Sequence, residues 1–344
     1  MNQIAAFNGL RFFITLVILF FHFGFEFRLK NYLFTQGRLG VELFFILSGF
    51  LLALTHEKST AVSSSHTSKQ LCINYFIRRF IRLWPEYIFT LVLAAFLLGR
   101  FNKSFLLSIF MIPCYPGVTP ILNVFWYIPI LFIYSCLLFN LLLFTKDKAK
   151  TIIFPSLALL CLFFLLNDKS HFISLNPNAT ARGLLGLITG MYTYWGCQTL
   201  KTCKISWRPQ FITAILLIGE IISTLGLGYL FVFRKGYNID TFNVYFYASF
   251  LIGLLFLKRE KLLKFLSWKI WVPFAKISYS LYLTHDILLI IAKEHYLPYI
   301  TTHILSSSVL FALIAIIFAT LCYFGQSCIF IFLKKIALQN STEQ

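Results

Sequence analysis

Charged residues are scarce in this sequence. Only 12% of its 344 residues are Asp, Glu, Lys or Arg, while 59% are hydrophobic. An ordinary soluble domain carries roughly 25% charged residues. No polar stretch is long enough to fold as a separate globule. The composition therefore excludes a soluble catalytic domain and favours helices that show apolar side chains to lipid and to each other. We expect one membrane domain over residues 1–335 and a short polar tail at 336–344.

Paired cysteines and metal-ligand clusters are also lacking. The eight cysteines are scattered without a C-x-x-C pair, so buried free thiols are expected. No metal site is predicted, because histidines, cysteines and acids do not recur at ligand spacing. The net charge of +18 does not indicate a nucleic-acid partner. The basic residues form short clusters between apolar runs, as topology-setting loops do.

What the sequence does contain is a succession of long apolar runs. A bilayer core takes roughly 20 apolar residues as helix. We therefore predict an all-α, polytopic transmembrane helical bundle of about ten spans. The expected spans are 6–27, 38–55, 84–99, 123–144, 151–167, 181–197, 209–231, 241–257, 274–293 and 304–333. The apolar segment 104–113 is too short to cross alone and is expected at the interface.

The distribution of basic residues orients these spans. Loops on the side of residue 1 hold roughly twice as many Lys and Arg residues as loops on the opposite side, which predicts both termini in the cytoplasm. On this topology the serine-rich residues 56–74 form a cytoplasmic connection.

The first span carries two ionisable residues, Arg11 and His22. Their spacing places them about 20° apart around a helix and about 16 Å apart along it, so they share one face. Arg11 is expected near the cytoplasmic side and His22 near the outer side. Ionisable groups inside a bilayer are costly and are therefore functional candidates. The alternative is a snorkelling arginine and a histidine satisfied by a neighbour.

The second span carries Glu42 near its outer end, at a depth similar to that of His22. A carboxylate beside an imidazole fixes its tautomer and raises its basicity, so we predict that Glu42 orients His22. The alternative is that Glu42 pairs with an arginine such as Arg38. Ser48 and Gly49 follow, and these small residues also suit close packing of helices.

Two further polar patterns stand on later helices. Arg79 and Arg82 are spaced i, i+3 at the start of the third span and can hold phosphates bidentately. The alternative is a positive-inside anchor. In the ninth span Ser278, Tyr282 and His285 form one polar stripe, which fits either a substrate site or interhelical hydrogen bonds. The buried acid Glu220 has no partner that the sequence identifies.

Together these motifs resemble the acyltransferase-3 family of membrane acyltransferases, which includes bacterial O-antigen and exopolysaccharide O-acetyltransferases. The matching segments are FNGLRFFITLVILFFHF with Arg11 and His22 in an Arg-x10-His pattern, GRLGVELFFILSGFLLA with Glu42, RRFIRLWPEY with Arg79 and Arg82, and ISYSLYLTH ending at His285. Many members also have a Trp-Ser-Leu-x-x-Glu motif in the fourth span. Here that stretch begins at Trp126 and lacks the acid, which leaves the type of acceptor open.

The resemblance implies transfer of an acyl group, commonly acetyl from acetyl-CoA, to a sugar hydroxyl of the cell envelope. The donor is then a co-substrate, and no permanently bound cofactor is expected. Arg11, Arg79 and Arg82 would bind the acyl-CoA. His22 would act as general base with Glu42 orienting it. The residues expected to bind substrate are Ser48, Trp126, Tyr279, Tyr282 and His285.

The expected partners are acyl-CoA, a carbohydrate or lipid-linked glycan acceptor and membrane lipid, and a homo-oligomer stays open. The resemblance places the chain in the inner membrane of a bacterium. Two other functions are compatible with the sequence. One is a transporter or flippase of lipid-linked sugars. The other is an acyltransferase that acts on a small molecule or a lipid.

Overall fold

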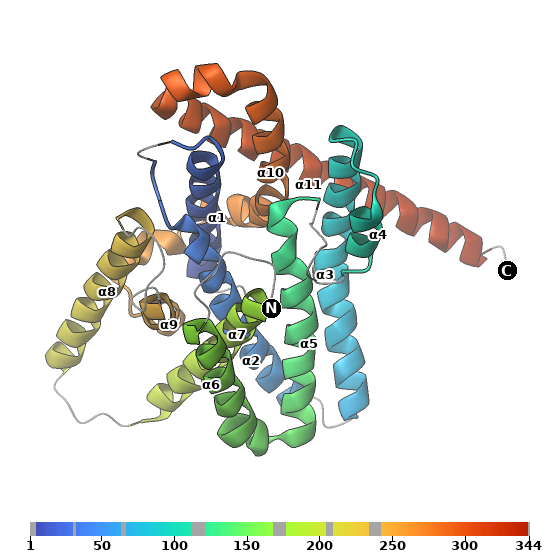
Figure 1. The fold of residues 1–344 in the computed structure, drawn as a ribbon. Helices are drawn as coiled ribbons and strands as arrows, with labels where there is room; N and C mark the ends of the chain where they lie inside the picture. Colours follow the sequence, from blue (N-terminus) through green and yellow to red (C-terminus); the bar gives the residue numbers. More distant parts are fainter. Residues whose placement is uncertain are drawn as a thin grey trace.

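The computed structural model describes residues 5–29, 32–62, 67–111, 121–167, 177–203, 209–233 and 242–342. Within these ranges the regular structure is entirely helical (Figure 1). The predicted fold class, an all-α polytopic bundle, is therefore confirmed.

The helices follow the apolar runs of the sequence. The main ones are α1 (Ala5–Glu26), α2 (Gly40–Val62), α3 (Ser68–Leu97), α4 (Lys103–Ile109), α5 (Tyr127–Thr145), α6 (Phe154–Asn167), α7 (Pro177–Thr202), α8 (Pro209–Val232), α9 (Asn243–Leu257), α10 (Trp271–Thr302) and α11 (Ile304–Thr342). Short helical segments precede several of them: η1 (Gly37–Leu39), η2 (Asn123–Trp126), η3 (Ala149–Ile153) and η5 (Leu262–Ser267).

Each of the ten predicted spans falls on one of these helices. In the described part of the chain, eight helices are long and apolar enough to cross a membrane by length and composition. The other two are α7, which carries more polar residues, and α9, which has only 15 residues. The short α4, with seven residues, agrees with the prediction that 104–113 cannot cross alone.

The predicted bounds of the connection at 56–74 are wrong at both ends, because helices extend into it. Helix α2 continues to Val62 and α3 already begins at Ser68. Thr67 caps α3, because its hydroxyl accepts the Gln70 N–H while the Gln70 side chain accepts the Thr67 N–H. This reciprocal capping box is a Thr-x-x-Gln signal that the apolarity of the chain alone does not reveal. At the other end of the chain, α11 continues through Thr342 and so includes most of the expected polar tail.

Helices α2 and α7 pack closely at the centre of the bundle, with α6 beside α7 (Figure 1). A Cβ atom on Gly49 would collide with the Leu187 carbonyl, and one on Gly190 would collide with the Ile46 carbonyl. Only glycine therefore allows this approach, as small residues do in many membrane helix pairs. The predicted packing role of Gly49 is confirmed.

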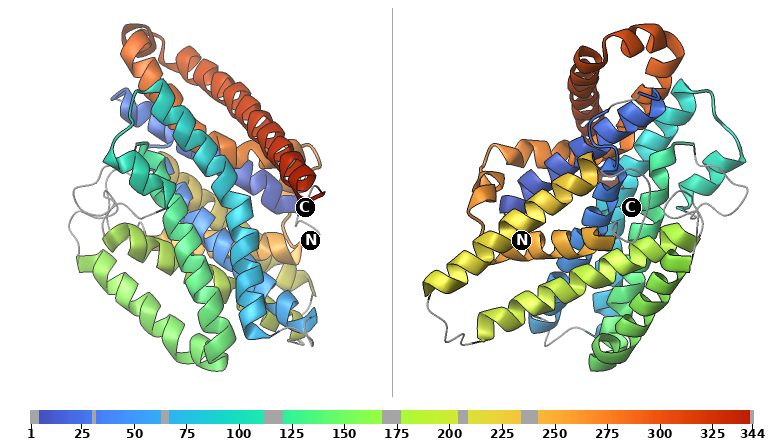
Figure 2. Two further views of the ribbon diagram at one scale, coloured as in Figure 1. Left: turned by 90° about the vertical axis from the view of Figure 1, so that its right-hand side faces the viewer. Right: turned by 60° about the vertical axis from the view of Figure 1, so that its left-hand side comes forward.

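Helices α1 and α10 form a second contact through the middle of the molecule, and α11 packs on α10. In Figure 2 the left-hand view shows α3 and α11 on the same face of the bundle, and these two helices are in contact. The segment η5 packs against α1. Glu220 of α8 holds η5 by accepting the Lys261 and Leu263 N–H groups, each at 2.9 Å. The acid without a predicted partner is thus a helix cap.

Candidate functional site

A cavity of about 500 Å³ opens between α1, α2, α3, α5 and α10. Its volume lies within the range of roughly 300–1,000 Å³ that is typical of small-molecule sites. Its lining includes seven of the residues that the sequence singled out: Arg11, Ser48, Arg79, Arg82, Ser278, Tyr279 and Tyr282. These residues come from four separate helices, so the fold brings together motifs that are far apart in the chain.

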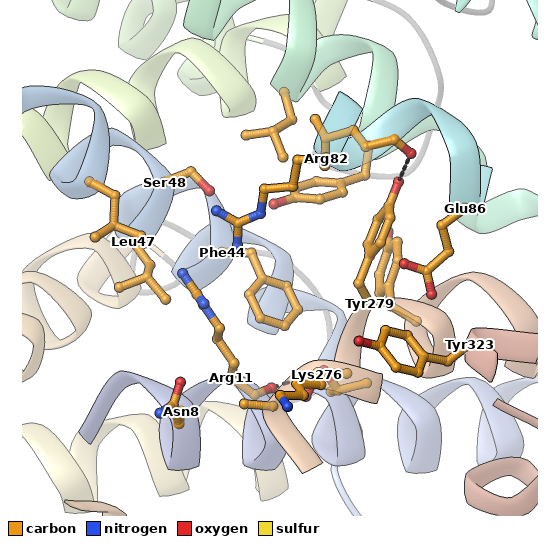
Figure 3. Close-up of a pocket in the computed structure, with 18 of the residues that line it drawn as sticks. Asn8, Arg11, Phe44, Leu47, Ser48, Arg82, Glu86, Lys276, Tyr279 and Tyr323 are labelled. Carbon is orange, nitrogen blue, oxygen red and sulfur yellow. Dashed lines mark hydrogen bonds between the residues drawn. The ribbon is translucent and has the colours of Figure 1, made fainter. Parts of the chain in front are cut away.

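The cavity has a strongly cationic lining. Arg11 and Arg82 extend toward one another from α1 and α3 (Figure 3). Arg79 lines the same cavity, so the three guanidinium groups share one electrostatic environment. Lys276 of α10 adds a fourth positive charge and is itself exposed.

Acidic side chains do not neutralise these arginines. Among the described residues, no ion pair joins a carboxylate to Arg11, Arg79 or Arg82. Arg79 Nε donates to Ser135 Oγ at 3.2 Å, while its Nη2 is buried without a partner. The one acid in the described lining, Glu86, bonds to Ser280 instead. Figure 3 shows Tyr279 between Glu86 and the two arginines. The cavity is therefore suited to a ligand with several negative charges.

Three aromatic rings of the cavity lining pack together, and one of them, Tyr282, also neighbours His285. The Tyr127 and Tyr282 ring centroids are 5.4 Å apart, and Phe44 lies 6.3 Å from Tyr127 and 6.2 Å from Tyr282. The Tyr282 hydroxyl donates to the Val124 carbonyl at 3.1 Å. We call Phe44, Tyr127 and Tyr282 the aromatic trio.

Two histidines meet beyond the aromatic trio. The His22 and His285 ring centroids are 5.2 Å apart, and Tyr282 lies 6.1 Å from His285. His285 is only 1% exposed. The structure thus places His22 next to His285, a predicted substrate residue that in turn neighbours Tyr282 of the cavity lining.

Glu42 makes a different contact from the one predicted. Its Oε1 atom pairs with Arg182 Nε at 2.6 Å, so the predicted pairing of Glu42 with His22 is not the interaction that the structure shows. The Arg182 guanidinium also lies over the Trp126 ring, 5.0 Å from its centroid. An arginine is the natural partner, because a fully buried carboxylate needs a compensating charge. Arg182 stands at the start of a predicted span, where the sequence does not say which neighbour it faces.

Asp286 is a further buried acid that the sequence argument did not assign. Its Oδ2 atom accepts the Asn123 N–H at 2.7 Å at the start of η2, the segment that ends at Trp126. The sequence feature that could have identified Asp286 is its position directly after His285.

Within the described ranges, no group of three or more His, Cys, Asp or Glu side chains is placed to hold a metal ion.

The fold and the cavity define a multi-pass integral membrane protein with a cationic ligand pocket inside its helical bundle. A family model described as an acyltransferase domain matches residues 4–325. The chain therefore belongs to the acyltransferase-3 family, and it is a membrane acyltransferase. Neither the curated proteins nor the solved structures contain a match to the chain.

Proposed function

We propose that the protein transfers an acyl group, in the first instance acetyl, from cytoplasmic acyl-CoA to a hydroxyl of a cell-envelope carbohydrate. The observation that carries this proposal is the cavity with three arginines free of acidic partners among the described residues. Coenzyme A carries a diphosphate and a further phosphate, and guanidinium groups bind phosphate bidentately. The cytoplasmic side is the predicted location of this cavity, because Arg11 and Lys276 lie near the predicted inner ends of α1 and α10.

In this proposal Arg79 and Arg82 hold the phosphates and Arg11 guides the donor into the bundle. Ser48 and Tyr279 line the path, and the acyl end reaches the aromatic trio. The fixed arginines hold the acyl donor in one orientation. Correct orientation of the reactants is a large part of the rate enhancement of transfer enzymes.

His22 is the proposed general base. It removes the proton from the acceptor hydroxyl, whose oxygen attacks the thioester carbonyl carbon. The carbon–sulfur bond then breaks, and the leaving thiolate of coenzyme A takes up the proton. In the two-step alternative the His22 nitrogen attacks the thioester carbonyl carbon, and the carbon–sulfur bond breaks to release the thiolate of coenzyme A. The acceptor oxygen then attacks the acyl carbon, the carbon–nitrogen bond breaks, and the hydroxyl proton goes to the thiolate.

Trp126 is the proposed platform for the acceptor sugar, with Tyr282 and His285 as neighbouring contacts. Arg182 over the Trp126 ring fixes this indole, and Glu42 in turn holds Arg182. Glu42 would therefore act on the acceptor side through Arg182, and not by orienting His22.

The test uses purified protein in nanodiscs with radiolabelled acetyl-CoA and an envelope glycan extract. We expect His22→Ala to abolish transfer of the label and to leave acetyl-CoA binding intact. Transfer that persisted in this variant would overturn the catalytic assignment. The envelope glycans of a deletion strain, analysed by mass spectrometry, identify the acceptor through the acetyl group that is missing.

The same experiment separates the alternatives. A transporter or flippase of lipid-linked sugars would move its substrate without consuming acetyl-CoA. An acyltransferase for a small molecule or lipid would leave the glycan profile of the deletion strain unchanged. The bacterial inner membrane is the proposed location, since acyl-CoA would enter from the cytoplasm.

A further inference from the structure

We propose that His285 positions His22 for catalysis, by accepting a hydrogen bond from one nitrogen of the His22 ring. This inference rests on the proposed function, in which His22 is the general base. It gives His285 the role that the sequence suggested for Glu42.

The hydrogen bonding of His285 determines its tautomer. Its Nδ1 atom lies 3.0 Å from the Leu281 carbonyl oxygen. A carbonyl can only accept, so Nδ1 carries the proton and Nε2 is left with a lone pair. That Nε2 atom is buried and has no hydrogen-bond partner. An unused acceptor in a side chain that is 1% exposed is costly unless it serves a ligand or a neighbour.

The ring separation fits a hydrogen bond between the two imidazoles. Ring nitrogens lie roughly 1.2 Å from the ring centre, so an N–H···N bond of roughly 2.9 Å needs centroids roughly 5.3 Å apart. The observed separation of the His22 and His285 centroids is 5.2 Å. Rotation of the His22 ring is then sufficient to direct one N–H at the His285 Nε2 atom.

His285 is the acceptor among the rings that lie against His22. These rings are Phe21 and His285, and Phe21 has no nitrogen. The Arg38 guanidinium has no lone pair to accept with. Glu42 pairs with Arg182 through Oε1, and its second oxygen is buried without a partner in the described part of the chain and in no recorded contact with His22. Asp286 accepts the Asn123 N–H. Among the described residues, His285 is therefore the acceptor that lies against the His22 ring.

The consequence for the reaction is a fixed protonation pattern. If one His22 nitrogen donates to His285, the other nitrogen must present its lone pair to the acceptor hydroxyl. His22 then takes the hydroxyl proton, the oxygen attacks the thioester carbon, and the thiolate leaves. His285 keeps its own proton throughout and acts on this step through His22.

Two substitutions separate this role from a structural one. In His285→Gln the side-chain amide reaches the place of Nε2, so an acceptor is retained and the Nδ1 contact to Leu281 is lost. In His285→Asn the amide reaches only the place of Nδ1, so the contact to Leu281 is retained and the acceptor for His22 is lost. The matched controls are His295→Gln and His295→Asn, because His295 lies exposed on the same helix.

We expect His285→Gln to retain at least a tenth of the kcat for acetyl transfer. His285→Asn should lose roughly 100-fold or more, since general base catalysis contributes roughly 10²–10⁴-fold. The KM for acetyl-CoA should stay unchanged in both, because His285 is not part of the described cavity lining. A structural role predicts the reverse order, with His285→Asn the more active. That order, or equal activity of the two variants, would overturn the inference.

A second measurement reports on His22 directly. In protein labelled with ¹⁵N-histidine, His22→Asn identifies the His22 resonances among those of the seven histidines. We expect His285→Asn to shift the His22 tautomer population, and His285→Gln to leave it near the parent value. An unchanged tautomer population in His285→Asn would refute the positioning role even if activity fell.

The two levels of the proposal fail differently. If His22→Ala still transfers acetyl, the proposed function itself is wrong. If His22→Ala is inactive while the two His285 variants behave alike, only the positioning role is wrong.

Discussion

Arg182 on α7 and Glu42 on α2 form an ion pair of 2.6 Å between side chains that are 5% and 0% exposed. Two charges leave water together when this pair forms, so each one depends on the other for compensation. The pair also ties the two most closely packed helices of the bundle to Trp126.

Glu42→Gln should therefore destabilise the protein by about 3–5 kcal/mol, since it leaves the Arg182 charge buried and uncompensated. The double variant Glu42→Gln/Arg182→Met should lose less than the sum of the single variants, because it removes both charges. The measurement is denaturant unfolding in detergent. The control is Lys293→Met, which breaks the partly exposed pair with Glu26 and should cost at most about 1 kcal/mol. Strict additivity of the two single variants would contradict this prediction.

Arg79→Gln and Arg82→Gln should weaken acetyl-CoA binding. A hydrogen bond to a charged group contributes about 1.5–3 kcal/mol, so each change should raise the Kd by roughly 10- to 150-fold. Added salt should weaken the parent more than the variants, because it screens the same charges. Arg78→Gln is the matched control, since Arg78 is exposed and its Nε bonds to the Asn74 carbonyl. Equal effects of all three substitutions in calorimetry would remove the phosphate role.

Phe44→Ala should change the preferred acyl chain. The Phe44 ring lines the cavity, and its removal makes room for additional methylene groups. In a hydrophobic pocket, one methylene group changes the transition-state binding free energy by roughly 1–3 kcal/mol. The kcat/KM ratio of butyryl-CoA to acetyl-CoA should therefore rise about tenfold or more. Phe96→Ala makes the same change on a side chain that is 74% exposed and should leave the ratio as it is. An unaltered ratio in Phe44→Ala would mean that the acyl group does not reach the aromatic trio.

Gly190→Ala should destabilise the crossing of α2 and α7. The added methyl would meet the Ile46 carbonyl of α2, and overpacking of this kind costs about 1–3 kcal/mol or more. Gly196→Ala on the same helix meets no atom within 4 Å and should be neutral or slightly stabilising. Thermal unfolding in detergent measures both. Similar melting temperatures for the two variants would contradict the close approach seen here.

The sequence predicted the helices well, because a bilayer demands long apolar runs and each run is visible in the chain. It also predicted that Arg11, Arg79 and Arg82 serve one site, and they converge on one cavity. The contact between His22 and His285, which lie far apart in the chain, was not predicted. Polar residues in an apolar helix face protein for energetic reasons, and so the spacing of these residues was informative.

Contacts between particular helices were harder to predict. Matched depth suggested that Glu42 meets His22, but depth does not determine the rotation of a helix or the order of its neighbours. The partner Arg182 is one of many basic residues near a predicted loop. Phe44 and Tyr127 carried no signal in a chain with 19% aromatic residues. The partners of Glu220 are backbone N–H groups, which no residue pattern distinguishes.

The aromatic trio also bears on how a bilayer stays insulating around such a site. An aqueous pocket with charged walls that continued through the bundle would short-circuit the ion gradients of the cell. Phe44, Tyr127 and Tyr282 pack together in the pocket lining, and the Tyr282 hydroxyl is tied to a backbone carbonyl. The same rings that meet the acyl group would thus narrow the aqueous path between the pocket and His22.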